Sequence, residues 1–155
     1  MSSLPKLSAL EMSTAEELQN KTTIEKMVSA FSEQDIEAIM SLFSTNATYY
    51  NVTGLGIMGG TYKGERAIRK IFERQFALLP IHFYDDPIIF VSGNKACANW
   101  NLVLGSPDQP DKQYRTRGCD YFELEGGRVT LKNAWLKNNF LTTLYAVVHR
   151  IRSVG

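Results

Sequence analysis

The sequence predicts an α+β fold in which helices come first and an antiparallel sheet follows. Apolar residues recur at helical spacing in three stretches before residue 80, and β-branched or aromatic stretches separated by turns fill residues 82–137. Helices that cover one face of an antiparallel sheet are the usual outcome of such an order. With 155 residues, 44% of them hydrophobic, the chain is long enough for one domain with a sizeable core.

The first helix is predicted to begin at Ser13, because Ser13 and Glu16 have the spacing of a capping box. Residues 1–12 are therefore expected to form a flexible leader, and residues 13–137 the folded domain. The last stretch, residues 138–155, fits a helix as well as a strand, so it is treated as a C-terminal extension of either kind.

Two more helices and one strand are predicted in the first half of the chain. DIEAIMSLF, residues 35–43, and ERAIRKIFERQFALL, residues 65–79, each have an apolar helical face, and Pro80 ends the second one. ATYYNV, residues 47–52, is rich in β-branched and aromatic residues and is predicted to be a strand. The glycine-rich segment 53–64 lacks the motifs of a phosphate-binding loop and is interpreted as a flexible lip of a pocket.

Four further strands are predicted at residues 82–91, 95–105, 113–124 and 128–137. In the third of them, RTRGCDYFEL, strict alternation places Asp120 and Phe122 on the apolar face. An unpaired buried charge is expensive, so this aspartate is expected to be paired, protonated or chemically active. Lys132 is a possible partner, because alternation in the last strand can point it inward.

Composition excludes several classes of function. The net charge is +1 and no basic cluster is interleaved with aromatic residues, so neither nucleic acid nor a membrane surface is expected as a partner. Cys97 and Cys119 form no CxxC motif, and His82 and His149 are isolated, so no metal site is expected. Without a signal peptide, the two thiols are interpreted as reduced cysteines of a cytoplasmic protein. No feature calls for a metal, flavin or nucleotide cofactor.

Three segments carry a resemblance to a known family: QDIEAIMSLFSTNATYYN, YKGERAIRKIFERQF and RGCDYFELEGGRV. Together with the order of elements, they resemble the SnoaL-like and ketosteroid isomerase-like branch of the nuclear transport factor 2 fold, over roughly residues 22–137. The resemblance implies a cone: a strongly curved antiparallel sheet wrapped around the N-terminal and central helices and enclosing an apolar pocket. It also implies a homodimer, because these folds often dimerise through the outer face of the sheet.

The resemblance gives Asp120 a functional position. In ketosteroid isomerase a protonated aspartate of this strand helps to form the oxyanion hole, and in SnoaL-type polyketide cyclases the strand carries an acid/base aspartate. The proton-shuttling aspartate of the isomerase, however, falls on Asn51, which is no base at neutral pH. Its oxyanion tyrosine falls near Met27, which has no donor. Steroid isomerisation by the familiar mechanism is therefore not expected.

Limonene epoxide hydrolase offers a second comparison. Its water-positioning Tyr-x-Asn pair matches Tyr49 and Asn51, but its Asp-Arg-Asp set is missing, with Ala134 at the last position. If the comparison applies, Asn101 lies inside the pocket. Alternation along the strand instead places Trp100 inward and Asn101 outward. Asn101 is kept as a candidate, since a bulge can reverse the alternation.

His82 is the second candidate for proton transfer. It opens a strand just after Pro80, at a position that lines the cavity in the isomerase family, and some dehydratases of this fold use a histidine near here as a base. Histidine suits proton transfer near neutral pH. The alternative is a partly exposed histidine at the start of a strand.

These observations predict a cofactor-independent enzyme that moves protons on a small apolar carbonyl compound, such as a polyketide or terpenoid intermediate. The reaction would be isomerisation, aldol-type cyclisation or dehydration, with Asp120 and His82 as catalytic groups. The residues expected to contact the ligand are Tyr49, Asn51, Trp100, Met27, Phe122, Lys132 and Asn101. The alternatives are a non-catalytic ligand-binding or dimerisation module, and an epoxide hydrolase-like addition of water. A salt bridge from Asp120 to Lys132 with His82 facing water favours the binding module. A shared cavity for Asp120 and His82 favours the enzyme.

Overall fold

The computed structural model describes residues 7–52, 59–78, 82–106 and 108–137, with side chains from residue 15 onward. These residues form an α+β fold with three α-helices, six strands and one short 3-10 helix, which confirms the predicted class. The elements in chain order are α1 (Leu7–Glu33), α2 (Ile36–Leu42), β1 (Phe43–Asn51), β2 (Gly60–Lys63), α3 (Glu65–Leu78), β3 (His82–Ser92), β4 (Lys95–Leu104), η1 (Pro110–Lys112), β5 (Tyr114–Glu125) and β6 (Arg128–Leu136).

Most boundaries lie close to the predicted ones, but two elements begin earlier. α1 begins at Leu7 rather than at Ser13, so the predicted capping box lies inside the helix and part of the expected leader is helical. The segment LSALEM that precedes Ser13 contains no glycine or proline, so nothing in it breaks the helix. β1 begins at Phe43, directly after α2.

The predicted pocket lip is partly regular structure. Its last residues, Gly60–Lys63, form the edge strand β2, while residues 53–58 lie outside the described part of the chain. The predicted C-terminal extension, residues 138–155, also lies outside it.

The six strands form one open sheet in the order β2-β1-β6-β5-β4-β3. Every neighbouring pair is antiparallel except β1 and β6, which run parallel. The expectation of a purely antiparallel sheet is therefore wrong at this one pair. Parallel neighbours require a long connection, and the chain between β1 and β6 contains α3 and four other strands.

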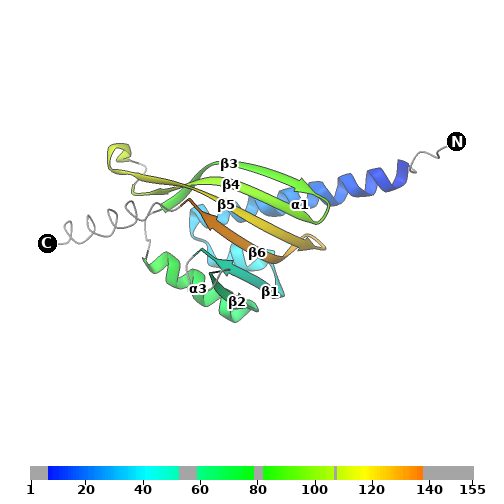
Figure 1. Cartoon of the computed structure of the whole chain (residues 1–155), viewed down its shortest axis with the longest axis horizontal. Helices are drawn as coiled ribbons and strands as arrows, with labels where there is room; N and C mark the ends of the chain where they lie inside the picture. Colours follow the sequence, from blue (N-terminus) through cyan, green and yellow to red (C-terminus); the bar gives the residue numbers. More distant parts are fainter. Residues whose placement is uncertain (1–6, 53–58, 79–81, 107, 138–155) are drawn as a thin grey trace.

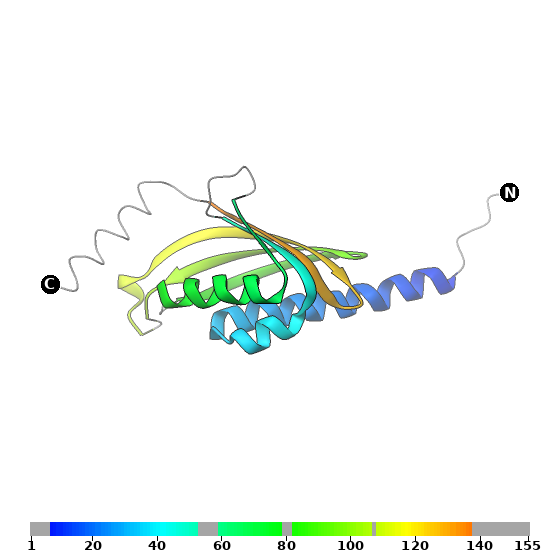
Figure 2. The same cartoon turned by 90° about the horizontal axis from the view of Figure 1, so that it is seen from below.

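All three helices cover the same face of the sheet, which curves over them (Figure 2). α1 lies against β3 and β4, and α3 lies against β1 and β2 (Figure 1). The core fills the space between the layers: Ile24 and Met27 of α1 and Ile68 and Phe72 of α3 are fully buried. Among the described segments, no helix is both long enough and apolar enough to cross a membrane.

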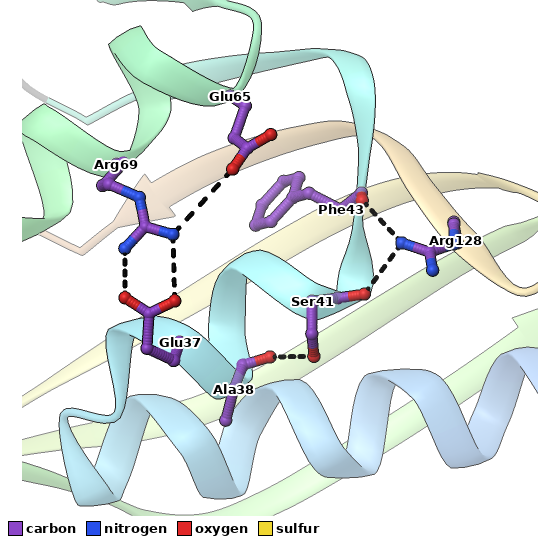
Figure 3. Close-up of polar contacts among 7 residues, drawn as sticks. All are labelled: Glu37, Ala38, Ser41, Phe43, Glu65, Arg69 and Arg128. Atoms are coloured by element: carbon purple, nitrogen blue, oxygen red, sulfur yellow. Dashed lines mark hydrogen bonds and ion pairs between the residues drawn. The ribbon is translucent and has the colours of Figure 1, made fainter.

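The short helix α2 is bound to α3 by a charged contact (Figure 3). Both terminal nitrogens of Arg69 donate to the carboxylate of Glu37, and Arg69 also lies 3.9 Å from Glu65. The hydrogen bonds and charge of Arg69 hold the pKa of Glu37 below its ordinary value of 4.5. At its start, α2 is capped by Asp35, whose carboxylate accepts from the backbone N–H of Ala38 at 2.9 Å.

The turn from α2 into β1 is held from the other side by β6. Nη1 of Arg128 donates to the carbonyl oxygens of Ser41, at 3.0 Å, and Phe43, at 3.3 Å (Figure 3). A helix end leaves carbonyl groups without helical partners, and an arginine satisfies them well. This contact fixes where β1 enters the sheet, and β1 carries two of the predicted ligand-contacting residues.

Candidate functional site

The inner face of the sheet carries the residues that alternation assigned to it. β5 pairs with β4 and β6 so that Asp120 lies between Ala98 and Ala134, and Phe122 lies between Ala96 and Lys132. Asp120 is only 5% exposed and Phe122 is fully buried. The predicted alternation of β5 is thereby confirmed.

Both oxygens of the Asp120 carboxylate have partners. Oδ1 lies 2.7 Å from Nζ of Lys132, and Oδ2 accepts a hydrogen bond of 2.9 Å from Nε1 of Trp100. Lys132 is 4% exposed, so this is an ion pair inside the protein. Of the three possibilities raised by the sequence, the structure thus shows a paired carboxylate.

The ammonium group of Lys132 is also surrounded by aromatic rings. Its nitrogen lies 5.2 Å from the ring centres of Phe31 and Tyr49 and 5.6 Å from that of Phe122. Aromatic faces attract cations, and more strongly away from water. A buried ion pair nevertheless often stabilises a fold no better than apolar residues of the same size. Stability alone therefore gives a weak reason for placing Asp120 and Lys132 here.

A small cavity lies between α1 and the sheet, beside this ion pair. Its volume is about 10 Å³, which is about the space that one water molecule needs. Asp120 is the one charged residue among those that line it. The lining residues are Met27, Val28, Phe31, Tyr84, Trp100, Asp120 and Phe122. A larger ligand requires some of these side chains to move.

Gly118 makes room for the indole ring that holds Asp120. The residue stands opposite Trp100 in the β4–β5 ladder, on the inner face. A Cβ atom at position 118 would overlap the ring at Cη2 and Cζ3. The absence of a side chain at Gly118 therefore permits the position from which Trp100 donates to Asp120.

His82 does not line the cavity but contacts Tyr84, which does. It is 6% exposed, its Nδ1 lies 3.3 Å from Nε2 of Gln34, and its ring centre lies 5.5 Å from that of Phe76. Ring contacts connect it to the cavity wall, from His82 to Tyr84 at 6.1 Å and from Tyr84 to Trp100 at 4.8 Å. The salt bridge from Asp120 to Lys132 is the arrangement expected of a binding module. The burial of His82 is not, because a binding module was expected to have His82 facing water.

Tyr49 and Asn51 form a polar cluster with a third residue that the sequence did not reveal. Tyr49 donates to Oδ1 of Asn51 at 3.0 Å, and Nε2 of Gln75 donates to the same oxygen at 3.0 Å. Gln75 also lies 3.5 Å from the Tyr49 oxygen. The two residues matched to the water-positioning pair of the epoxide hydrolase therefore contact each other and α3.

Asn101 stands apart from these groups. It is half-buried and alternates with Trp100 along β4, so it belongs to the outer face of the sheet. The other predicted ligand contacts are brought together: Met27, Trp100 and Phe122 line the cavity, and Lys132 connects Asp120 to the ring of Tyr49.

The cavity also contains residues that sequence reasoning did not propose as ligand contacts. Phe31 lies one helical turn after Met27, and Tyr84 lies two residues after His82, so helical and strand periodicity could have found both. Val28 adjoins Met27 on the same apolar face of the helix. For Gln75 the sequence holds no such signal, because its contact joins α3 to β1.

Tyr49, which is buried, and Tyr84, which is partly buried, give the fold a dependence on high pH. Burial raises the pKa of Tyr49 and of Tyr84 above the ordinary value of 10.0. Between that value and the higher folded pKa, only the unfolded chain loses these protons. These two tyrosines are therefore expected to leave the free energy of unfolding unchanged below pH 10 and to lower it as the pH rises further.

Urea unfolding between about pH 8 and about pH 11 measures this decline in the free energy of unfolding. Tyr49→Phe should make the decline shallower by up to about 1.4 kcal/mol per pH unit. An equally steep decline in Tyr49→Phe would contradict the assignment.

The sequence model of the SnoaL-like domain family matches residues 24–132, which include α2, α3, the described cavity and most of the sheet. No curated protein sequence matches the chain significantly.

Solved structures with the same fold share little sequence with this chain. A candidate polyketide cyclase from Xanthomonas campestris pv. campestris has a TM-score of 0.64 and 15% identity, with 81% of this chain and 94% of that one covered. A candidate ketosteroid isomerase from Kribbella flavida has a TM-score of 0.63 and 15% identity, with 80% and 82% covered. TerC, co-crystallised with polyporic acid, has a TM-score of 0.61 and 16% identity, with 77% and 92% covered. At these identities the likeness shows the fold.

Proposed function

Because this chain belongs to the SnoaL-like domain family, we propose that it binds a small apolar carbonyl compound between α1 and the sheet and catalyses proton transfer on it. Polyketide and terpenoid intermediates are the substrate classes that fit, and no cofactor is needed for such chemistry. The observation that carries the proposal is the carboxylate of Asp120, which faces an aromatic cavity and is held by Lys132 at 2.7 Å.

Each of the two charged groups suits one half of the reaction. Asp120 would take a proton from the carbon next to the substrate carbonyl. Lys132 does not line the cavity, so the ligand would displace a ring such as Phe31, after which the ammonium group would stabilise the negative charge that forms on the carbonyl oxygen. Trp100 would hold the carboxylate in place through its 2.9 Å hydrogen bond. Isomerisation, aldol-type cyclisation and dehydration can all begin with the enolate formed in this step.

In this proposal the partner of Asp120 is Lys132, and His82 has a more distant role. The rings of Tyr84 and Trp100 connect His82 to the carboxylate, so His82 would meet the far end of a ligand. Tyr49 and Asn51 would orient a ligand oxygen once their contacts with each other are exchanged for contacts with the ligand.

A second function, ligand binding without catalysis, is favoured by a different observation. Both oxygens of Asp120 already have partners, and the cavity is only about 10 Å³. A carboxylate that keeps both partners after a ligand binds would position the ligand but would not take its proton.

The two functions are separated by an exchange experiment with 2-tetralone, an apolar ketone whose α-hydrogens exchange readily. In D2O, NMR follows the entry of deuterium at the α-carbon, and tryptophan fluorescence follows binding. We expect the wild type to accelerate exchange and Asp120→Asn to lower that rate by about 100-fold or more. Asp85→Asn is the matched control, because it alters an exposed carboxylate bound by Arg115 at 2.8 Å.

Three outcomes decide between the functions. Loss of exchange with retained binding supports catalysis by Asp120. Binding by the wild type without faster exchange supports the binding module. Equal exchange in the wild type and a folded Asp120→Asn variant would refute the role of Asp120. If the single variant does not fold, the Asp120→Asn/Lys132→Met double variant replaces it, because it leaves no buried unpaired charge.

The outer face of the sheet supports a homodimer in the same proposal. Phe90 of β3 is 61% exposed and Trp135 of β6 is 50% exposed, and Ile88 is exposed as well. Ile88 and Trp135 belong to one row across the sheet, through Asn99 and Cys119. Exposed apolar groups gathered on one face are typical of a protein interface. Light scattering of the wild type and of Trp135→Glu tests this, with a dimer expected for the wild type alone.

A further inference from the structure

The two cysteines, which the proposed function does not use, lie in contact on the outer face of the sheet. Cys97 of β4 pairs with Tyr121 of β5, and Cys119 of β5 pairs with Asn99 of β4, so the two cysteines are diagonal neighbours. Their sulfur atoms are 3.1 Å apart. Both are free thiols, and both are half-buried in the single chain. Cys119 lies in the row between Ile88 and Trp135, so the homodimer proposed above would cover it, and the oxidation proposed here belongs to the monomer. A disulfide requires the sulfurs to come about 1 Å closer, to roughly 2.05 Å.

We propose that Cys97 and Cys119 form a redox-modification site that closes to an intrachain disulfide on exposure to a peroxide. Hydrogen peroxide first oxidises one thiol to a sulfenic acid and is reduced to water. The second thiol then attacks that sulfur, the S–S bond forms, and the sulfenic oxygen leaves as a second water molecule. The two thiols together lose two electrons and two hydrogens, and the peroxide accepts them.

The short distance decides which product follows the first oxidation. A sulfenic acid with no thiol nearby can be oxidised further to a sulfinic acid, which is irreversible in most proteins. Here the two sulfur atoms are already in contact. The strands that carry them, β4 and β5, are joined by a continuous ladder from Lys95 to Leu104 of β4. Condensation to the disulfide is therefore expected to precede further oxidation.

The reactivity of the pair is limited by its surroundings. Burial and the neighbouring Cys97 thiol raise the pKa of Cys119 to about 12, so Cys119 is protonated near neutral pH. Thiolates react with peroxides and thiols do not, so oxidation that begins at Cys119 is expected to be slow.

The bond would form directly behind the candidate site. Asp120 follows Cys119 and stands opposite Ala98, which follows Cys97, so the disulfide would flank this pair of residues. It would also close the loop from residue 97 to residue 119. We expect the melting temperature to rise by about 5–10 °C on oxidation, because the unfolded chain is constrained.

The test uses the native 155-residue chain, both as the wild type and as Trp135→Glu, in which the outer face is expected to stay uncovered. It is exposed to hydrogen peroxide at about tenfold molar excess, the peroxide is removed with catalase, and the chain is then unfolded in denaturant that contains iodoacetamide, so that every remaining thiol is alkylated. We expect a mass loss of about 2 Da, no alkylated cysteine, and a linked peptide pair that contains both cysteines. Dithiothreitol should restore two alkylatable thiols and the original melting temperature.

Matched serine variants identify the partner. Cys97→Ser and Cys119→Ser each leave one thiol, so neither should lose 2 Da within one chain, and each should proceed to higher oxidation states instead. The proposal is overturned if both wild-type thiols remain alkylatable, if sulfinic acid is the main product, or if the disulfide links two chains on a non-reducing gel. The linked peptide of the wild type decides the question even if a serine variant does not fold, and none of these outcomes depends on the exchange experiment with 2-tetralone.

Discussion

Replacing Lys132 by methionine is expected to lower the free energy of unfolding by about 3–5 kcal/mol. The change removes the partner at 2.7 Å and leaves the carboxylate of Asp120 buried with one remaining donor, Trp100. Asp120→Asn should be similarly destabilising, because the ammonium group then stands unpaired among the rings of Phe31, Tyr49 and Phe122. Urea unfolding at neutral pH measures both effects.

The double variant Asp120→Asn/Lys132→Met should be far more stable than the sum of the single changes implies. Replacing both members of a buried ion pair removes both desolvation penalties, so the coupling in a double-mutant cycle is expected to exceed about 2 kcal/mol. Arg115→Gln is the matched control. It breaks the exposed pair with Asp85, and exposed pairs contribute at most about 1 kcal/mol. Single effects below 1 kcal/mol that simply add would show that the pair is solvated.

Adding one methyl group at Gly118 is the second change with a large expected effect. The new Cβ of Gly118→Ala would overlap the Trp100 ring, which packs edge-on against Tyr84 at 4.8 Å and has little free space. The ring must rotate or the two strands must separate. We expect a loss of about 1–3 kcal/mol, with loss of the hydrogen bond from Trp100 to Asp120.

Tryptophan fluorescence can follow this change directly. The chain has two tryptophans, so in a Trp135→Phe background Trp100 is the only tryptophan, and its emission is selected by exciting above the tyrosine absorption band. Gly118→Ala should then shift the emission to longer wavelength, as the indole moves from its buried position. Trp100→Leu is the matched control. In that background Gly118→Ala should cost much less, and an undiminished cost would place the strain in the backbone of β5.

The strand β5 shows best which features of the fold could be predicted from the sequence. Side chains of a strand alternate strictly, so the inward position of Asp120 and Phe122 follows from the residue order alone. The apolar face of α3 followed from helical periodicity in the same way, and Ile68, Phe72 and Phe76 are all buried. Local patterns of this kind fix which face of an element is buried, and they do so without knowledge of its neighbours.

Contacts between elements are the part that the sequence left open. Whether Lys132 reaches Asp120 depends on the register of β6 against β5, and whether the cysteines touch depends on the register of β5 against β4. The two-residue turn between Glu125 and Arg128 fixes the register of β6 beside the turn, but an irregularity between Glu123 and Leu124 shifts it before Lys132 is reached. β4 and β5 are joined by a longer connection, which does not fix their register in this way. The contact of Gln75 with Asn51 depends on how α3 packs over β1, and the parallel direction of β1 and β6 is likewise a property of the whole sheet.

The pairing of β1 with β6 also has a consequence for how the chain folds during synthesis. β6 is the last described strand, yet it lies in the middle of the sheet and separates the β1–β2 hairpin from the β3–β4–β5 meander. Each of these two parts can form early from contacts between sequence neighbours, but they cannot join until β6 leaves the ribosome. Until then the inner edges of β1 and β5 have no strand partner, so the nascent chain presents two exposed sheet edges to chaperones and to other nascent chains.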